Sequence, residues 1–259
     1  MKVTSWNVNS IRARLEHVLN WWDENRPDVL CLQETKVKNE DFPKEPFEDR
    51  GLHVYIHGQP AYNGVALISR QPLADVEFGF DDGDLEGHTR IIRARMGDIF
   101  LINGYFPQGE SPDSPKFSFK RQFYGKMLET LQKSYKPTQK VLLCGDLNVA
   151  PDDIDVYDAE KVRGRCMFTD EEKSWLQNLR DWGLTDAFRH TNPDEQVFSW
   201  YDYRQLSYQT GKGWRIDHFW VTDSLLEAYI GGTHHKKERG KPKPSDHVPV
   251  DAEFKLKKG

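Results

Sequence analysis

The stretch VLLCGDLNVAP, from Val141 to Pro151, reads as a strand that is built for burial yet ends in polar side chains. Asp146 and Asn148 come at the end of its apolar residues, and Pro151 cannot continue a strand ladder. Aspartate and asparagine are frequent in turns because their side chains bond nearby backbone groups. The stretch by itself is explained equally well by a tight turn or by a functional site, and the rest of the chain has to decide.

Short segments rich in Val, Ile, Phe and Trp, bounded by turn residues, predict strands along the whole chain. These segments are 2–8, 28–33, 53–57, 64–69, 74–80, 90–96, 99–106, 140–145, 214–222 and 248–255. Apolar stripes with helical spacing predict two helices, at Leu15, Val18, Leu19 and Trp22 and at Phe119, Phe123, Met127 and Leu131. A capping box of Thr169 and Glu172 predicts a third, with the stripe Trp175, Leu179 and Trp182.

Two clusters of strands with a few flanking helices favour an α/β fold of two packed sheets covered by helices. The composition has no break that would divide the chain, so a single domain over residues 1–259 is expected. Hydrophobic residues at 37% and charged residues at 30% are typical of a soluble globular protein. No apolar run approaches the ~20 residues of a membrane span, and the N-terminus reads as a strand rather than a signal peptide.

The cysteines and the charge pattern limit which cellular compartment and which binding partners are expected. Three cysteines cannot all pair, and Cys31 and Cys144 lie in apolar strands, so reduced thiols and a cytoplasmic, monomeric protein are expected. A net charge of −5 argues weakly against nucleic-acid binding. Basic residues nevertheless cluster in KFSFKRQFYGK (116–126), where they alternate with aromatic residues, and in HHKKERGKPK (234–243). Each run alone is a solvated face, but together they allow a positively charged surface.

Polar residues at strand ends recur along the chain, as they do after Val141. They are Asn7 and Asn9, Gln33 and Glu34, Asn103 and Tyr105, Asp146 and Asn148, Asp217, and Asp246 and His247. One such event is a turn, but this many, with no zinc-type Cys/His spacing and no serine elbow, indicate a site assembled from strand ends. Carboxylate and amide oxygens suit Mg²⁺ or Mn²⁺ rather than zinc. Because carboxylates repel a phosphodiester, phosphoryl chemistry at such a site requires a cation.

The ordered motifs resemble the exonuclease III family of DNA-repair nucleases, within the wider endonuclease/exonuclease/phosphatase superfamily. They are SWNVNSIRA, PDVLCLQETK, GVALISR, GYFPQGE, CGDLNVAP, GLTDAFRH, GWRIDHF and PSDHVPV, and the resemblance runs from Lys2 to about Phe254. A motif such as SDH is weak alone, but the ordered set is specific. GWRID and GYFPQGE favour the DNA-repair branch over the lipid and inositol phosphatases.

The resemblance implies a four-layer α/β sandwich with the site at one end of its two sheets. It also implies Mg²⁺-dependent cleavage of double-stranded DNA 5′ to an abasic site, or removal of nucleotides or blocking groups from 3′ ends. The implied roles are metal binding by Glu34, Asn7 and Asp246, activation of water by Asp146, positioning by Asn148, phosphate contact by His247 oriented by Asp217, and phosphate or leaving-group contact by Tyr105. Whether His247 is a base or a cationic clamp stays open, with the clamp preferred because Asp146 can serve as base.

Several residues have a plainer alternative explanation. Asp217 alone could be a buried acid satisfied by a backbone amide, Trp6 is expected in the core, and His88, His234 and His235 are expected at the surface. In the family, the positions of Trp200, Trp214 and Ile216 line a pocket for a flipped-out sugar, although aromatic residues are usually core; Tyr201 and Arg204 lie near enough to touch DNA.

The segment 159–168 is shorter than in some relatives, which leaves the balance between exonuclease and abasic-site endonuclease activity open. Two rival functions also remain at this point. One is a phosphatase or phosphodiesterase acting on inositol or sphingolipid head groups with the same metal site. The other is a non-catalytic DNA-binding module, which would require the loss of a ligand; none of the expected residues is missing.

Overall fold

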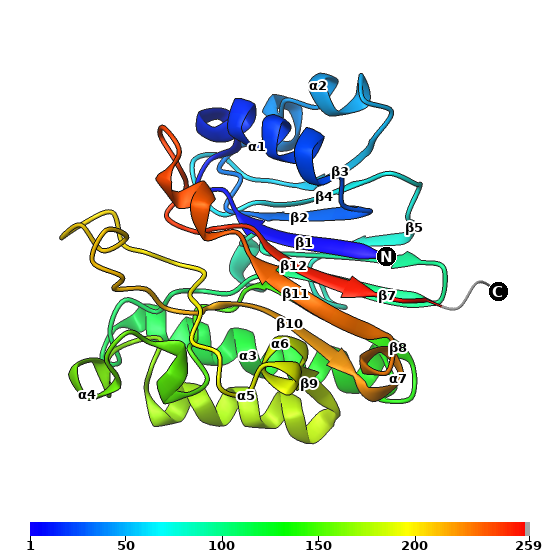
Figure 1. The fold of residues 1–259 in the computed structure, drawn as a ribbon. Coiled ribbons are helices and arrows are strands. Elements are labelled where there is room, and N and C mark those ends of the chain that lie inside the picture. Colours follow the sequence, from blue (N-terminus) through cyan, green and yellow to red (C-terminus); the bar gives the residue numbers. More distant parts are fainter. Residues whose placement is uncertain (257–259) are drawn as a thin grey trace.

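The computed structural model describes residues 1–256 and places two six-stranded sheets face to face (Figure 1). The first sheet has the order β11-β12-β1-β2-β4-β3 and the second the order β5-β6-β7-β8-β10-β9. The strands of the first sheet are β1 (Lys2–Asn7), β2 (Val29–Gln33), β3 (His53–His57), β4 (Val65–Ser69), β11 (Tyr229–His234) and β12 (Val250–Phe254). Those of the second are β5 (Ala74–Phe78), β6 (Ile91–Met96), β7 (Ile99–Tyr105), β8 (Lys140–Asp146), β9 (Leu184–Asp186) and β10 (Asp217–Thr222).

Helices cover the outer face of each sheet, which gives the four layers. The α-helices are α1 (Ile11–Asn25), α2 (Glu45–Glu48), α3 (Pro115–Ser134), α4 (Ala159–Val162), α5 (Asp170–Trp182), α6 (Ala187–Thr191) and α7 (Asp223–Leu226). Figure 1 shows α1 and α2 on the outside of the first sheet and α3 and α5 on the outside of the second. Both sheets are mixed, because β1 and β2 run parallel, as do β7 and β8, while the other pairs are antiparallel. The expected α/β sandwich is confirmed.

The alternation of side chains along β8 explains why its sequence is apolar throughout. Leu142 and Cys144 pack into the core between the two sheets, whereas Val141 and Leu143 pack into the core under α3 and α5. A strand that is buried on both faces has no polar side to show, so it reads as a continuous hydrophobic run. The third core lies between the first sheet and α1, where Trp6 is fully buried as expected.

Most expected strands agree with the structure to within two residues, and the three expected helices correspond to α1, α3 and α5. The strand expected over 214–222 begins only at Asp217, because Trp214 instead exchanges backbone hydrogen bonds with Trp200. The short strand β9 was not expected, nor was β11, whose paired glycines have low strand propensity. Within residues 1–256, no helix combines the length and the apolar character that crossing a membrane requires.

Three side-chain expectations are wrong. The basic stretch 116–126 is not wholly solvated, because Lys120 lies on the buried face of α3 with a relative exposure of 0%. His235 is not a free surface residue, since its Nε2 lies 2.7 Å from Asp251 Oδ2. His234 is half-buried and packs edge-on against Phe188. All three cysteines are free and buried.

Candidate active site

Strand register brings the polar strand ends of the second sheet together around Asp146. Parallel pairing of β7 with β8 places Tyr105 beside Asp146, and antiparallel pairing of β10 with β8 places Asp217 on its other side. Asn7, at the end of β1 in the other sheet, reaches across and donates from Nδ2 to Asp146 Oδ2 at 2.9 Å. The two sheets therefore meet in one polar cluster at their common end.

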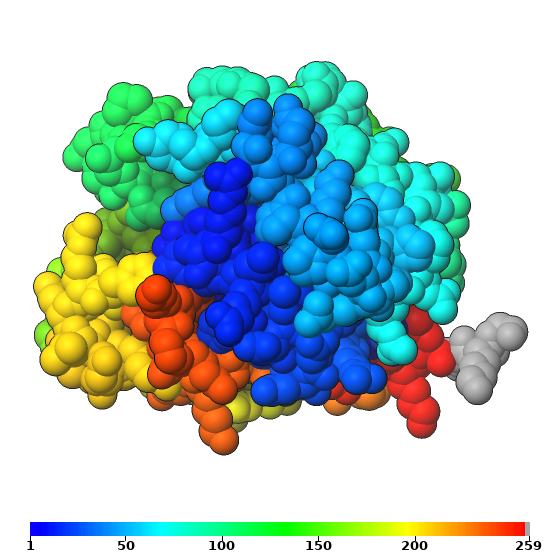
Figure 2. Space-filling view, turned by 90° about the horizontal axis from the view of Figure 1, so that it is seen from above, coloured from blue at the N-terminus to red at the C-terminus, as the bar shows by residue number. Residues whose placement is uncertain are grey.

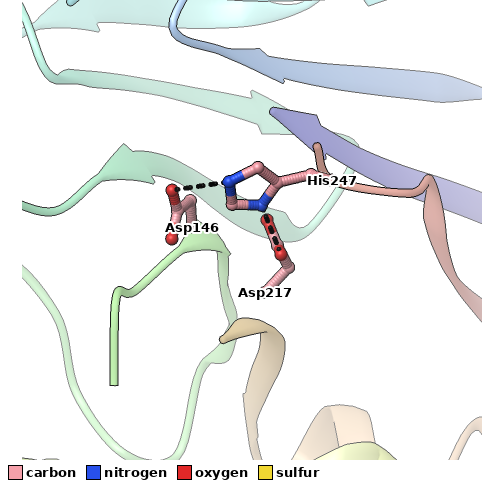
Figure 3. Close-up of side chains that lie close together, drawn as sticks. All are labelled: Asp146, Asp217 and His247. Atoms are coloured by element: carbon pink, nitrogen blue, oxygen red, sulfur yellow. Dashed lines mark hydrogen bonds and ion pairs between the residues drawn. The ribbon is translucent and has the colours of Figure 1, made fainter. Parts of the chain in front are cut away.

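His247 completes this cluster from the segment that precedes β12 (Figure 3). Its Nδ1 lies 2.8 Å from Asp217 Oδ2, and its Nε2 lies 3.7 Å from Asp146 Oδ2. The segment is held in place by Ser245, whose hydroxyl donates to the Asn7 carbonyl at 2.6 Å and accepts from the His247 amide. The expected pairing of Asp217 with His247 is thus present in the geometry.

Burial and mutual charge shift the titration of this cluster. Burial lowers the pKa of His247, but the carboxylates of Asp217 and Asp146 outweigh that effect and raise the pKa to about 10. Burial raises the pKa of Asp146 to about 7, against the attraction of His247. At neutral pH the imidazole is therefore a cation, and Asp146 is poised to exchange a proton.

The sequence left open whether Asn148 belongs to a tight turn or to a functional site. In the structure it forms a turn and also lies beside Asp146. Its backbone is left-handed, with φ 53°, a conformation that asparagine tolerates better than most residues. Its amide donates to Asp146 Oδ1 at 3.0 Å, and its Nδ2 donates to the Phe106 carbonyl at 2.9 Å. The turn after β8 therefore holds the Asn148 side chain beside Asp146.

Glu34 and Asp246 lie on the other side of Asn7, linked by two residues that were given no role from the sequence. Lys36 Nζ lies 3.0 Å from Glu34 Oε1 and donates to Asn9 Oδ1 at 2.6 Å. Asn9 Nδ2 in turn donates to Asp246 Oδ1 at 2.9 Å. Asn9 and Lys36 each lie two positions after a predicted site residue, Asn7 and Glu34. Sequence proximity alone does not show that their side chains turn toward the site.

The oxygen-rich side of the cluster fits a hard divalent cation. Burial and then the carboxylate of Glu34 raise the pKa of Tyr105 well above its ordinary value, and Asp146 and Asp246 add to the shift. Two cations offset part of this negative charge, because Lys36 pairs with Glu34 and the Arg90 guanidinium lies 4.7 Å from the centre of the Tyr105 ring. Asp146, Asp217 and His247 are also close enough together to hold an ion.

Two cavities flank the cluster. One of about 610 Å³ is lined by Trp200, Arg204 and Trp214, among others, and one of about 600 Å³ is lined by Glu34, Tyr105 and Arg90, among others. Figure 2 shows the rims of the first, a green segment that includes residues 108–112 and a yellow one that includes residues 202–207, projecting on the same side of the molecule.

The four residues expected at a substrate pocket differ in their placement. Trp200 also donates from Nε1 to Asp246 Oδ2 at 2.9 Å, so it supports the cluster as well as the cavity wall. Trp214 is 6% exposed and packs edge-on against Phe168. Ile216 is 1% exposed and belongs to the core under the helices rather than to the wall of this cavity.

A buried charge network that was not predicted supports the turn after Asn148. Arg215 donates to Asp155 and Asp186, with the closest contacts at 2.6 and 2.7 Å, and also contacts His218 Nδ1 at 3.0 Å. His218 Nε2 lies 2.9 Å from the Val149 carbonyl. Arg215 and His218 lie in the motif GWRIDHF, but only the folded chain shows that they face Asp155 and Asp186.

His218 is expected to contribute less to the stability of the protein as the pH is lowered from 7 toward 4, whereas the raised pKa of Asp146 acts in the opposite direction. Burial, and then the charge of Arg215, lower the pKa of His218 from 6.5 to about 4. Below pH 6.5 the unfolded chain therefore binds a proton that the folded chain refuses, which costs about 3 kcal/mol by pH 4. Denaturant unfolding at several pH values tests this. Compared with the wild type, His218→Gln should lose less stability, or gain more, between pH 7 and pH 4; the exposed His190→Gln should behave like the wild type, and equal slopes in all three proteins would contradict the prediction.

Two packed mixed sheets, with a buried Asp–His–Asp cluster and hard-oxygen ligands at their common end, define an α/β-sandwich hydrolase of phosphoester bonds. The model of the Endonuclease/Exonuclease/phosphatase family matches residues 4–247, and the chain belongs to that family. It is 39% identical to the exodeoxyribonuclease III of Haemophilus influenzae, over 98% of this chain and 100% of that protein.

Comparison with solved structures supports the same family assignment. A 3′ phosphatase from Neisseria bound to a product DNA hairpin matches with a TM-score of 0.95 and 38% identity, covering 99% of this chain and 100% of that chain. An AP endonuclease from Archaeoglobus fulgidus matches with the same TM-score, identity and coverage. The resemblance expected from the motifs is confirmed, as is the assignment to hydrolases of phosphodiester bonds.

Proposed function

We propose that this protein is a Mg²⁺-dependent DNA-repair phosphodiesterase that cleaves DNA 5′ to abasic sites, removes nucleotides or blocking groups from 3′ ends, or does both. The observation that carries the proposal is the cluster of Asp146, His247 and Asp217 at the common end of the two sheets, beside a cavity walled by two tryptophans. There Asp146 could contact a water, His247 a phosphate, and the two tryptophans an extruded sugar.

In this proposal the charged residues divide the work of in-line attack on phosphorus. Asp146, with a pKa near 7, takes the proton of the attacking water, and Asn148 orients that water or the phosphate. His247, held cationic and oriented by Asp217, binds a non-bridging phosphate oxygen. Tyr105 stays protonated and can donate a hydrogen bond to the leaving oxygen. The cationic state of His247 supports its action as a clamp over action as a base.

Glu34 and Asn7 are the residues we assign to Mg²⁺, with Asp246 close by. When bound, the cation neutralises the phosphate charge that the surrounding carboxylates would otherwise repel. Glu34 and Asn7 offer hard oxygen atoms, which suit Mg²⁺, and Mn²⁺ as a substitute. Both oxygens of Asp246 accept hydrogen bonds, from Asn9 and Trp200, and Asn7 Oδ1 accepts one from the Asn9 amide, but each oxygen keeps a second lone pair for a metal ion.

The relatives support DNA as the substrate. The Haemophilus protein is an exodeoxyribonuclease III, and the Neisseria and Archaeoglobus structures are of a 3′ phosphatase with a DNA hairpin and of an AP endonuclease. The proposal accordingly takes double-stranded DNA with abasic sites or 3′ ends as the partner. It also includes a monomer acting in the cytoplasm, where the free thiols Cys31, Cys144 and Cys166 would stay reduced.

One set of incubations tests the proposed function. The protein is mixed with Mg²⁺ and, separately, a duplex carrying one abasic site, a duplex with a 3′ phosphate, and an inositol phosphate, with a chelator in parallel. A nick 5′ to the abasic site or release of the 3′ phosphate, abolished by the chelator, is the expected result. Hydrolysis of the inositol phosphate alone would favour the rival phosphatase, and no hydrolysis of any substrate would favour a binding module.

Trp214→Ala is expected to impair abasic-site incision far more than hydrolysis of a small chromogenic phosphodiester. A lost apolar contact at a pocket wall lowers kcat/KM for a substrate that fills the pocket by ~10–200-fold. Because Trp214 is also buried, its removal should cost ~3–5 kcal/mol of stability. Trp175→Ala, at a tryptophan of similar burial on α5, is the matched control. If both variants lose activity equally on both substrates, Trp214 is simply a core residue.

A further inference from the structure

Lys120 is a charged residue that occupies the core beside the proposed site. It lies in the middle of α3 with a relative exposure of 0%, and its ammonium donates to Glu172 Oε1 at 2.5 Å. It also donates to the carbonyl of Asn148 at 2.7 Å and to that of Gln108 at 3.1 Å. An ammonium has three N–H groups, so this one is fully used.

Glu172 is as fully buried as Lys120, and its hydrogen-bonding capacity is also fully satisfied. Its carboxylate accepts from the Met167 amide at 2.9 Å and from the Thr169 amide and hydroxyl at 3.0 and 2.8 Å, in addition to Lys120. The pair therefore joins α3 to the first turn of α5 and to the segment before it. No lone pair or proton of the two charged groups points to solvent or to a cavity.

Stability alone does not explain a buried ion pair. Desolvating two charges costs free energy that their attraction only partly offsets, and an apolar pair of similar volume is often as stable or more stable. An apolar pair cannot form directional hydrogen bonds, whereas the Lys120 ammonium donates to two particular backbone carbonyls. One belongs to the turn after β8, which carries Asn148, and the other to the segment after β7, where Gln108 lines both cavities beside the cluster.

The turn after β8, which Lys120 contacts, has a backbone conformation that requires stabilisation. Asn148 has a left-handed backbone, which most residues adopt at a cost. With its carbonyl bound by Lys120, its amide by Asp146 and its Nδ2 by Phe106, the peptide plane and the side chain are both fixed. Lys133, farther along the same helix, instead pairs with Glu129 at the surface.

We infer that Lys120 and Glu172 are positioning residues for catalysis, which hold the Asn148 turn in its working conformation through the Asn148 carbonyl. The inference rests on the proposed nuclease function. Loss of the ammonium releases that carbonyl and lets the side chain shift relative to Asp146. A misplacement of about 1 Å at a reacting group can cost about 100-fold in rate. The loss should fall on kcat, since nothing in the pair touches substrate.

The test compares Lys120→Met, Lys120→Met/Glu172→Gln, Lys120→Arg and the surface control Lys133→Met in abasic-site incision, well below each melting temperature. The double variant removes both charges, so we expect it to stay folded even if an unpaired Glu172 unfolds the single variant. We expect it to lower kcat about 100-fold with a much smaller change in KM. Lys120→Arg, which keeps the charge and the donors, should recover part of kcat, and Lys133→Met should match the wild type.

A second cycle identifies the residue through which Lys120 acts. In an Asn148→Ala background there is no side chain left to position, so adding Lys120→Met/Glu172→Gln should not lower kcat further. A full additional loss in that background, or wild-type kcat in the folded double variant, would overturn the inference. A wild-type protein that fails to incise DNA would overturn the proposed function instead, so the two failures are distinguishable.

Discussion

His247→Asn and Asp217→Asn are expected to lower kcat by about 10²–10³-fold, and the double variant should lose little more than His247→Asn alone. Asp217 holds His247 Nδ1 at 2.8 Å, so it acts only through the imidazole that it orients and keeps charged. Once the imidazole is gone, the carboxylate has nothing left to orient. Single-turnover rates on the abasic duplex at saturating Mg²⁺ give the three free energies that the cycle requires.

The chain offers a matched control for this cycle. His235 and Asp251 form another partly buried His–Asp pair, with Nε2 2.7 Å from Oδ2. His235→Asn, Asp251→Asn and their combination should leave kcat unchanged while altering stability. Losses at His247 and Asp217 that add fully in free energy would show that the two residues work independently.

Glu34→Ala is expected to raise the Mg²⁺ concentration needed for half-maximal rate and to lower kcat by more than about 100-fold. Residues that only support a metal ligand already cost 10–100-fold when they are changed, and Glu34 is assigned as the ligand itself. The fold should survive, because the side chain is 18% exposed and lies outside the apolar cores. Activity is measured against Mg²⁺ concentration, and Mn²⁺ binding is measured directly by calorimetry without substrate.

Glu129→Ala controls for the loss of a carboxylate, since Glu129 pairs with Lys126 and Lys133 on the surface of α3. Its Mn²⁺ binding and its activity should equal those of the wild type. If Glu34→Ala binds Mn²⁺ as tightly as the wild type does, Glu34 is not a ligand, whatever happens to the rate.

Much of the fold and most of the proposed site could be predicted from local patterns. The capping box of Thr169 and Glu172, the helical stripes and the apolar strands are properties of neighbouring residues, and the structure keeps them. The polar residues at strand ends do come together in the structure, because strands that lie side by side in one sheet bring their ends together. Asp146 meets Asp217 for this reason, across one rung of the β8–β10 ladder.

The sequence by itself thus determined most of the strands and which of their ends carry polar side chains. Only the tertiary structure decided that Lys120 turns inward to Asn148 and Glu172, that Lys36 and Asn9 link Glu34 to Asp246, and that Trp200 supports Asp246. Apart from the Lys36–Glu34 pair, whose members are two positions apart, these contacts join residues 27 to 237 positions apart, where no periodicity relates the partners. Whether a lysine on a helix meets water or a carbonyl depends on which distant loop packs over it, and that is set by the assembled core.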